Sequence, residues 1–328
     1  MPSNLRIWCL TCALCCAACD ERVCADQQAR TQVLPPQLSE TGLFADLGQQ
    51  RLAAGVFAYT PEFALWSDGA SKRRFIAIPE GSRIDSHDAE AWTVPEGTKL
   101  WKEFSLGDVH LETRLLQKTG PGPADWAAAA YVWRADQSDA TLAPYGAIDV
   151  LGTAHDVPAS GECFACHDGR PGRVLGFSAV QLAPRSYDTP ERLSAAASEA
   201  LLSDAMPRLD IPGTPAERAA LGYLHANCSH CHNQSESARS SNKCFNPNDR
   251  LSFDLDFTLH AQELGSVAST AAYRTALGEV IESGDPGASK VVALMSKRAG
   301  GLNQMPPLGT EQVDETGLSL VREWIGSL

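Results

Sequence analysis

Short hydrophobic runs with the alternation typical of β-strands fill the first half of the chain after about residue 40. The runs are rich in β-branched and aromatic residues, and turn-forming Pro, Gly and Asp residues separate them. The predicted strands are Arg74–Ile78, Ala91–Val94, Lys99–Phe104, Val109–Leu116 and Trp126–Trp133. Strands at this spacing predict an antiparallel β-sandwich-like domain over residues 41–154.

After residue 155 the hydrophobic positions follow helical spacing instead. Thr214-Pro215-Ala216-Glu217 is a capping box with Pro at the first helical position, so a helix is expected to run from there into Cys228. Further helices are expected from about Thr189, over Ala288–Arg298 and over Asp314–Ile325. The second half is therefore expected to be an all-α region of two segments, 155–212 and 213–328.

The N-terminus has the pattern of an export signal. Arg6 precedes an apolar run from Ile7 to Ala18, which is about the length of a signal-peptide core and too short to span a membrane. We expect residues 1–18 to be removed on export, and residues 19–40 to form a polar, Pro-containing tether.

Two cleavage sites remain open. Ala17-Ala18-Cys19 resembles the end of a lipoprotein signal, which makes Cys19 a candidate lipid site, although Cys16 stands where Leu is usual. Cleavage after Ala25 is the alternative, and it gives secretion without an anchor. Both place the protein in the cell envelope, either periplasmic or anchored at the outer membrane.

Two pentapeptides carry the chemistry: Cys163-Phe164-Ala165-Cys166-His167 and Cys228-Ser229-His230-Cys231-His232. Each is a C-x-x-C-H sequence, which is the attachment site of a c-type haem. Two thiols at this spacing form thioethers to one porphyrin, and the following His is the axial ligand of its iron. The sequence therefore predicts two haems c, on Cys163 and Cys166 and on Cys228 and Cys231, with His167 and His232 on the metal.

Zinc is the main alternative, because paired C-x-x-C sequences also form zinc sites. The chain runs 62 positions from Cys166 to Cys228, far beyond the usual gap of about 15–20 in a zinc ribbon. Zinc also leaves unexplained the His that follows both pairs, and a thioredoxin-like redox site needs only one pair.

Removal of the signal peptide accounts for most of the other cysteines. Cys9, Cys12, Cys15 and Cys16 leave with the signal peptide, which leaves Cys24 and Cys244 outside the lipid and haem sites. An oxidising compartment permits a disulfide between these two, but nothing in the sequence supports that pairing.

The distal haem ligands are sought among methionines and histidines. Met305 precedes two prolines in a loop before the last predicted helix, and we expect it to bind the second haem, whereas Met295 is expected to fill a helical core. For the first haem the candidates are Met206, which also precedes Pro, and His155, with His225 or an open position as further alternatives.

With these residues in view, the chain resembles a family of uncharacterised bacterial exported di-haem c-type cytochromes, which have a β-rich N-terminal region and a C-terminal cytochrome c domain. The resemblance runs from about Leu38 to the end. The segments that carry it are Leu38–Phe44, Leu65–Arg74, Glu112–Leu116, Tyr131–Trp133, Asn227–His232, Gly284–Pro286 and Met305–Pro307. It implies an all-α cytochrome c-type haem region with His167 and His232 axial and Met305 distal. The chain departs from this pattern by an insert over Ser235–Asn248.

Electron transfer through two haems is the expected function, rather than enzymatic catalysis. The first alternative is an enzyme similar to the di-haem peroxidases, although those place one motif in each of two similar domains. The second makes the β-rich region a binding module, with its tryptophans as a ligand face in place of a core. Trp66-Ser67-Asp68-Gly69 is otherwise expected to be a turn.

The net charge favours some classes of binding partner over others. The chain carries a formal charge of −13, which argues against nucleic acid and permits steering toward a basic patch on a redox partner protein. The same acidity also serves solubility alone. Membrane association is expected only through the lipid anchor.

Overall fold

The structure is a computed structural model that describes residues 34–170, 172–187, 190–234, 254–307 and 309–328. The signal peptide, Cys19, Cys24, Cys244, the Ser235–Asn248 insert and the helix start expected at Thr189 lie outside the described residues. Of the helices in the described part, none has the length and apolar character needed to cross a membrane.

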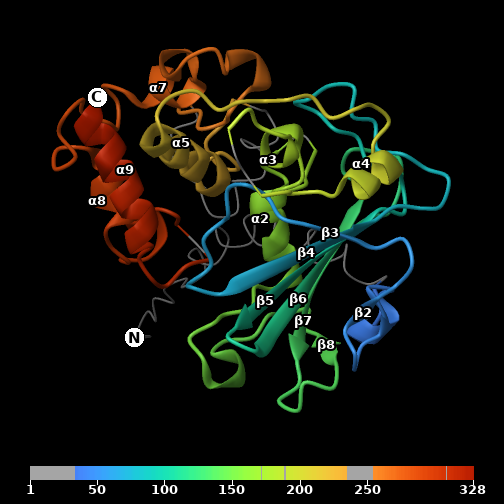
Figure 1. Cartoon of the computed structure of the whole chain (residues 1–328). Helices are drawn as coiled ribbons and strands as arrows, with labels where there is room; N and C mark the ends of the chain where they lie inside the picture. Colours follow the sequence, from blue (N-terminus) through green and yellow to red (C-terminus); the bar gives the residue numbers. More distant parts are fainter. Residues whose placement is uncertain (1–33, 171, 188–189, 235–253, 308) are drawn as a thin grey trace, which may run out of the picture.

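One six-stranded antiparallel sheet forms the centre of the molecule, and each strand pairs with its neighbours in sequence (Figure 1). Its strands are β3 (Phe57–Tyr59), β4 (Ser71–Ala77), β5 (Lys99–Leu106), β6 (Val109–Lys118), β7 (Trp126–Trp133) and β8 (Ala140–Leu142). A separate two-stranded sheet pairs β1 (Phe44–Asp46) with β2 (Arg51–Leu52). The predicted strand over Ala91–Val94 is wrong, because that segment makes only an isolated bridge from Thr93 to Asp85.

The two faces of the large sheet bury different clusters. Phe75, Trp101 and Leu115 point to one face, where Leu38 and Leu43 of the N-terminal segment cover them. The opposite face packs against residues of the segment 164–202. The side chains of that second cluster include Ile76, Leu100, Leu116, Phe164, Leu182 and Leu201. In the described chain the only other sheet is the two-stranded one, which adds Phe44 and Leu52 to the first cluster, so the predicted sandwich is replaced by one large sheet with mostly irregular and helical segments on both sides.

Four of the five tryptophans of this region are buried, as expected for core residues: Trp92, Trp101, Trp126 and Trp133. Trp66 is half-buried, and its indole Nε1–H donates to the Gln312 carbonyl at 3.2 Å. The neighbouring Asp68 accepts hydrogen bonds from Thr310 Oγ1 and from the Glu311 and Gln312 amides, at 2.9–3.0 Å. The turn at Trp66–Gly69 therefore ties the sheet region to a loop of the C-terminal part.

Seven helices are described, and most are short. They are α2 (Cys163–His167), α3 (Ala179–Leu182), α4 (Ala195–Leu201), α5 (Pro215–Asn227), α7 (Ala271–Ala276), α8 (Lys290–Met295) and α9 (Glu315–Ser327). Figure 1 shows the last four near one end of the sheet. The protein is thus a mixed α/β fold, and the expected all-α cytochrome region is not shown, because loops and 3₁₀ turns separate these short helices.

Helix α5 forms as its sequence predicts. Thr214 Oγ1 accepts from the Glu217 amide at 3.3 Å, and Glu217 Oε2 accepts from the Thr214 amide at 2.6 Å, which completes the capping box. At the other end, Cys228 is the C-cap. The helix therefore delivers the second C-x-x-C-H sequence directly.

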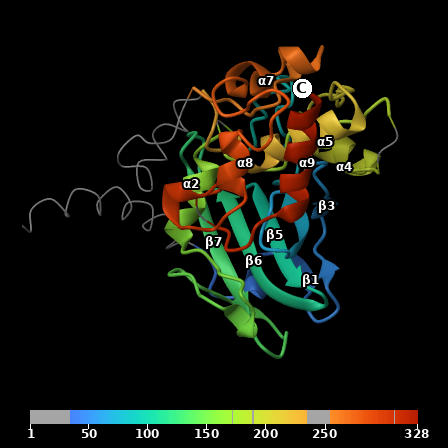
Figure 2. The same ribbon diagram turned by 90° about the vertical axis from the view of Figure 1, so that its left-hand side faces the viewer.

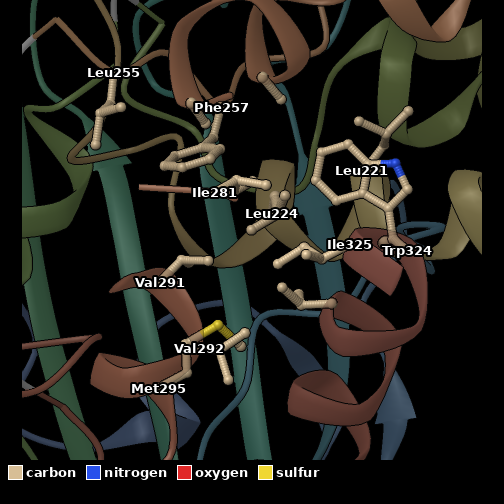
Figure 3. Packing of buried hydrophobic residues seen from close by; sticks show 14 of the residues in the cluster. Leu221, Leu224, Leu255, Phe257, Ile281, Val291, Val292, Met295, Trp324 and Ile325 are labelled. Carbon is tan, nitrogen blue, oxygen red and sulfur yellow. The ribbon is translucent and has the colours of Figure 1, made fainter. Parts of the chain in front are cut away.

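A further hydrophobic cluster, apart from the two on the faces of the sheet, holds α5, α8 and α9 together, and Figure 3 shows part of it. Leu221 and Leu224 of α5 pack with Trp324 and Ile325 of α9, while Met295 joins from α8. Met295 thus fills core, as predicted, and Cys228 packs against the edge of the same cluster. The relation of this core to the sheet is seen from the side in Figure 2.

Candidate functional site: two adjoining C-x-x-C-H turns

The first C-x-x-C-H sequence is itself a single turn of helix, α2. In one helical turn, positions separated by three and four residues share a face, so Cys163, Cys166 and His167 lie together. Phe164, between them in sequence, is fully buried in the cluster under the sheet. The motif is therefore anchored by its intervening side chain and presents its two thiols and its imidazole on one side.

The His167 imidazole is held in one tautomer. Its Nδ1–H donates to the Arg173 carbonyl at 2.7 Å, so the lone pair is on Nε2. Burial, followed by the charge of Lys102, lowers the pKa of His167 from 6.5 to about 3, so the ring is neutral. A neutral imidazole whose other nitrogen is hydrogen-bonded to a carbonyl has the usual form of a metal-binding histidine.

The second C-x-x-C-H sequence continues directly from α5. The Cys231 and His232 amides donate to the Cys228 carbonyl at 3.1 and 2.8 Å, which closes the turn. Asn227 fixes its start, because its Oδ1 accepts from the Trp66 amide at 2.7 Å and its Nδ2 donates to the Ala64 carbonyl. The His232 ring packs edge-on against Phe257, with ring centroids 5.8 Å apart.

The two turns touch, although they are 64 positions apart at the point of contact. Asn233 Nδ2 donates to the Gly169 carbonyl at 2.8 Å and to the Ser229 carbonyl at 2.6 Å, so one amide bridges both motifs. A Cβ on Gly169 would lie 1.7 Å from the His230 carbonyl oxygen, which only glycine permits. The sequence predicts each motif, and the structure brings them side by side.

The four motif cysteines are free thiols. Burial raises the pKa of Cys163 to about 11 and that of Cys228 to about 12, so both are protonated at neutral pH. Within the described ranges, no three His, Cys, Asp or Glu side chains converge as ligands of a metal ion. The arrangement is unlike a zinc site, in which four such side chains meet at one point.

Met305 lies in a loop that the structure holds firmly. Its amide donates to the Leu294 carbonyl at 3.0 Å, and the neighbouring Gln304 side chain accepts from the Ala299 and Gly300 amides at 2.8 Å. The Met305 side chain is half-buried. The sequence identified this loop, which Asp68 also supports through residues 310–312.

The candidates for the first haem differ in how their side chains are occupied. His155 Nε2–H donates to Glu112 Oε1 at 2.9 Å, and Glu112 is fully buried and paired with Arg114. His225 accepts from the Leu259 amide on Nδ1 at 3.1 Å, which places its proton on Nε2. Met206 is half-buried and packs against the same hydrophobic cluster as Cys163. Unlike His155 and His225, it makes no hydrogen bond through its side chain in the described part.

One set of residues near the motifs was missed by the sequence reasoning. Arg74, Lys102 and Arg114 lie directly opposite one another on β4, β5 and β6, on the face that also bears Ile76, Leu100 and Leu116. The signal was present in the sequence, since these cations share the alternation of the buried residues.

Comparison with known proteins gives no relative: no family model, curated protein or solved structure matched the chain.

Proposed function

We propose that this protein is an exported di-haem c-type cytochrome that transfers electrons through two covalently attached haems. Cys163 and Cys166 would hold one and Cys228 and Cys231 the other, with His167 and His232 as axial ligands. The observation that carries the proposal is the contact between the two C-x-x-C-H turns through Asn233. Two redox groups attached to adjoining turns can exchange electrons within one chain.

The local chemistry of each turn supports haem. The haems supply the one-electron redox chemistry, and the chain supplies ligands and surroundings. The Arg173 carbonyl keeps Nε2 of His167 free of a proton, and the buried Phe164 fixes the turn. Protonated thiols that do not converge with other ligands in the described ranges suit addition to vinyl groups better than they suit a shared metal ion.

For the distal positions we propose Met305 on the second haem and Met206 on the first. His155 is the weaker candidate, because binding iron through Nε2 would break its hydrogen bond to the buried Glu112 and leave that carboxylate less well paired. Thioether ligation raises the reduction potential relative to two histidines, which suits an electron carrier.

The wider setting belongs to the same proposal. The segments 155–212 and 213–328 would then serve as the two haem-bearing parts of a cytochrome, with 41–154 as the region on which they pack. Export follows from residues 1–18, with a lipid on Cys19 as the proposed anchor. The charge of −13, or −14 without Arg6, favours a redox partner with a basic patch.

Optical spectra with and without carbon monoxide or peroxide test this function. We expect low-spin spectra in both oxidation states, unchanged by either ligand, because both irons carry a distal side chain. Met305→Ala should make one of the two haems bind carbon monoxide. Met295→Leu is the matched control, since Met295 fills core and should leave the spectra unchanged.

The contrary outcomes are equally plain. Carbon monoxide or peroxide binding by the unaltered protein would indicate an open iron and favour the peroxidase-like alternative. An unchanged spectrum of Met305→Ala would mean that Met305 is not the ligand.

A further inference from the structure

Three cations stand in a row across the centre of the sheet. Arg74 is the register partner of Lys102, and Lys102 is the partner of Arg114, so each pair is directly cross-strand. Like charges directly opposite each other destabilise a sheet. A row that breaks this rule on a largely buried face indicates that an anion compensates it.

Among the described residues, one member of the row has an anionic partner. Arg114 forms a two-pronged pair with Glu112, with distances of 2.9 and 2.5 Å. Arg74 is only 5% exposed, and its Nε has no hydrogen-bond partner in the part of the chain that the structure describes. Lys102 Nζ lies 6.0 Å from the centre of the Phe104 ring, and among the described residues it forms no ion pair.

Arg74 and Lys102 line a small cavity between the sheet and the second motif. Arg170, His225, Ser229 and His230 form part of its other side, and its volume is about 50 Å³. That volume equals about one to two water molecules, which is the size of a carboxylate group.

The row also lowers the pKa of Lys102. Burial, then the charges of Arg74 and Arg114, lower the pKa of Lys102 from 10.5 to about 7. A carboxylate in the cavity would offset both effects, since it pairs with the ammonium group and replaces lost hydration.

We propose that Arg74 and Lys102 bind the carboxylate side chains of the haem attached at the adjoining motifs. The inference rests on the proposed function and assigns it a further site. Haem c carries two carboxylates, and an arginine and a lysine are the side chains that bind such groups best. The sheet would thereby set the potential of the haem as well as support it.

Lys102→Gln tests the site by redox titration of the haem-loaded protein. A cation near the carboxylates favours the reduced haem, which carries one positive charge fewer. Its removal should shift the equilibrium of one haem about fivefold toward the oxidised form, which is about 40 mV at 59 mV per tenfold. Lys102→Arg retains the charge and should keep this equilibrium within about twofold of its value in the unaltered protein.

Lys99→Gln is the matched control. Lys99 lies on the same strand but on the opposite face, where its Nζ donates to the Thr41 carbonyl at 2.7 Å. Lys99→Gln removes the same charge and should shift the redox equilibrium of neither haem by more than about twofold. A Lys102→Gln shift no larger than that of Lys99→Gln, in protein that retains both haems, overturns the inference and leaves the proposed function standing.

A free anion is the other source of the same chemistry. If the cavity binds a soluble carboxylate or oxyanion, adding acetate or phosphate at constant ionic strength will move the potential of the unaltered protein and not that of Lys102→Gln. That result would also overturn the inference. An insensitive potential in both proteins supports a carboxylate of the haem itself. Unaltered protein without haem would instead overturn the proposed function.

Discussion

At the scale of single residues, the direction of a side chain decides what each motif can do. Cys163, Cys166 and His167 share a side because their spacing matches one helical turn, and that part is readable from the sequence. The bond from His167 to the Arg173 carbonyl is not, because it depends on how the following loop returns. The same holds for His155, whose partner Glu112 is 43 positions away.

His260 provides a residue-scale prediction about pH. Its two ring nitrogens each lie 3.1 Å from a carboxylate, Asp256 Oδ2 and Glu90 Oε2, so the ring is protonated. These two hydrogen bonds raise the pKa of His260 from 6.5 to about 9. Because the pKa is higher in the folded state, protonated His260 stabilises the fold. This contribution is fully present below pH 6.5 and is lost as the pH rises through about 9. The free energy of unfolding should therefore fall over this window by about 1–3 kcal/mol, allowing for solvent screening.

The measurement is urea unfolding of the unaltered protein and of His260→Gln between pH 6 and pH 9.5. The difference in unfolding free energy between the two proteins isolates the contribution of His260. It should be largest near pH 6 and shrink as the pH rises. A difference that stays constant, or grows with pH, would contradict the assigned protonation.

At the scale of elements, local signals were reliable where the local sequence decides the structure. The capping box starts α5 at Pro215, and the central strands β5, β6 and β7 follow the predicted runs closely. The sandwich was not found, since alternation shows that a strand has a buried face but not what covers that face. Ala91–Val94 has strand-like composition, yet Thr93 alone finds a partner for a bridge.

The contact between the two motif turns gives the element-scale prediction. Gly169→Ala places a methyl group against the His230 carbonyl, so the turns must move apart. We expect a loss of about 1–3 kcal/mol in the free energy of unfolding, together with slower electron exchange between the haems. Denaturant unfolding and fast kinetics after reduction of one haem measure these two effects.

Gly172→Ala is the control for this change. A Cβ on Gly172 would lie 3.5 Å from the Trp92 carbonyl oxygen, which is ordinary contact. It should alter stability by no more than about 0.5 kcal/mol. Equal losses from the two substitutions would mean that the close approach at Gly169 does not hold the turns together.

At the scale of the whole molecule, the sheet and the motif region form one site. Phe164 of the first motif packs into the cluster under the sheet, and Asn227 ties the second motif to residues 64–66. The sequence predicts an axial histidine for each proposed haem, but nothing in it indicates that the motifs adjoin, because that contact joins residues 64 positions apart. A chain with a net charge of −13 also keeps three cations in a row beside the motifs, and their alternation with the buried residues is the one sign of this row in the sequence.

The count of covalent haems tests the account most directly. Protein exported by a host that matures c-type cytochromes should contain two haems per chain, by intact mass and by the haem absorbance of the alkaline pyridine complex. Cys163→Ser with Cys166→Ser should remove one haem, and Cys228→Ser with Cys231→Ser the other. A matured, exported chain that carries no covalent haem would contradict the account.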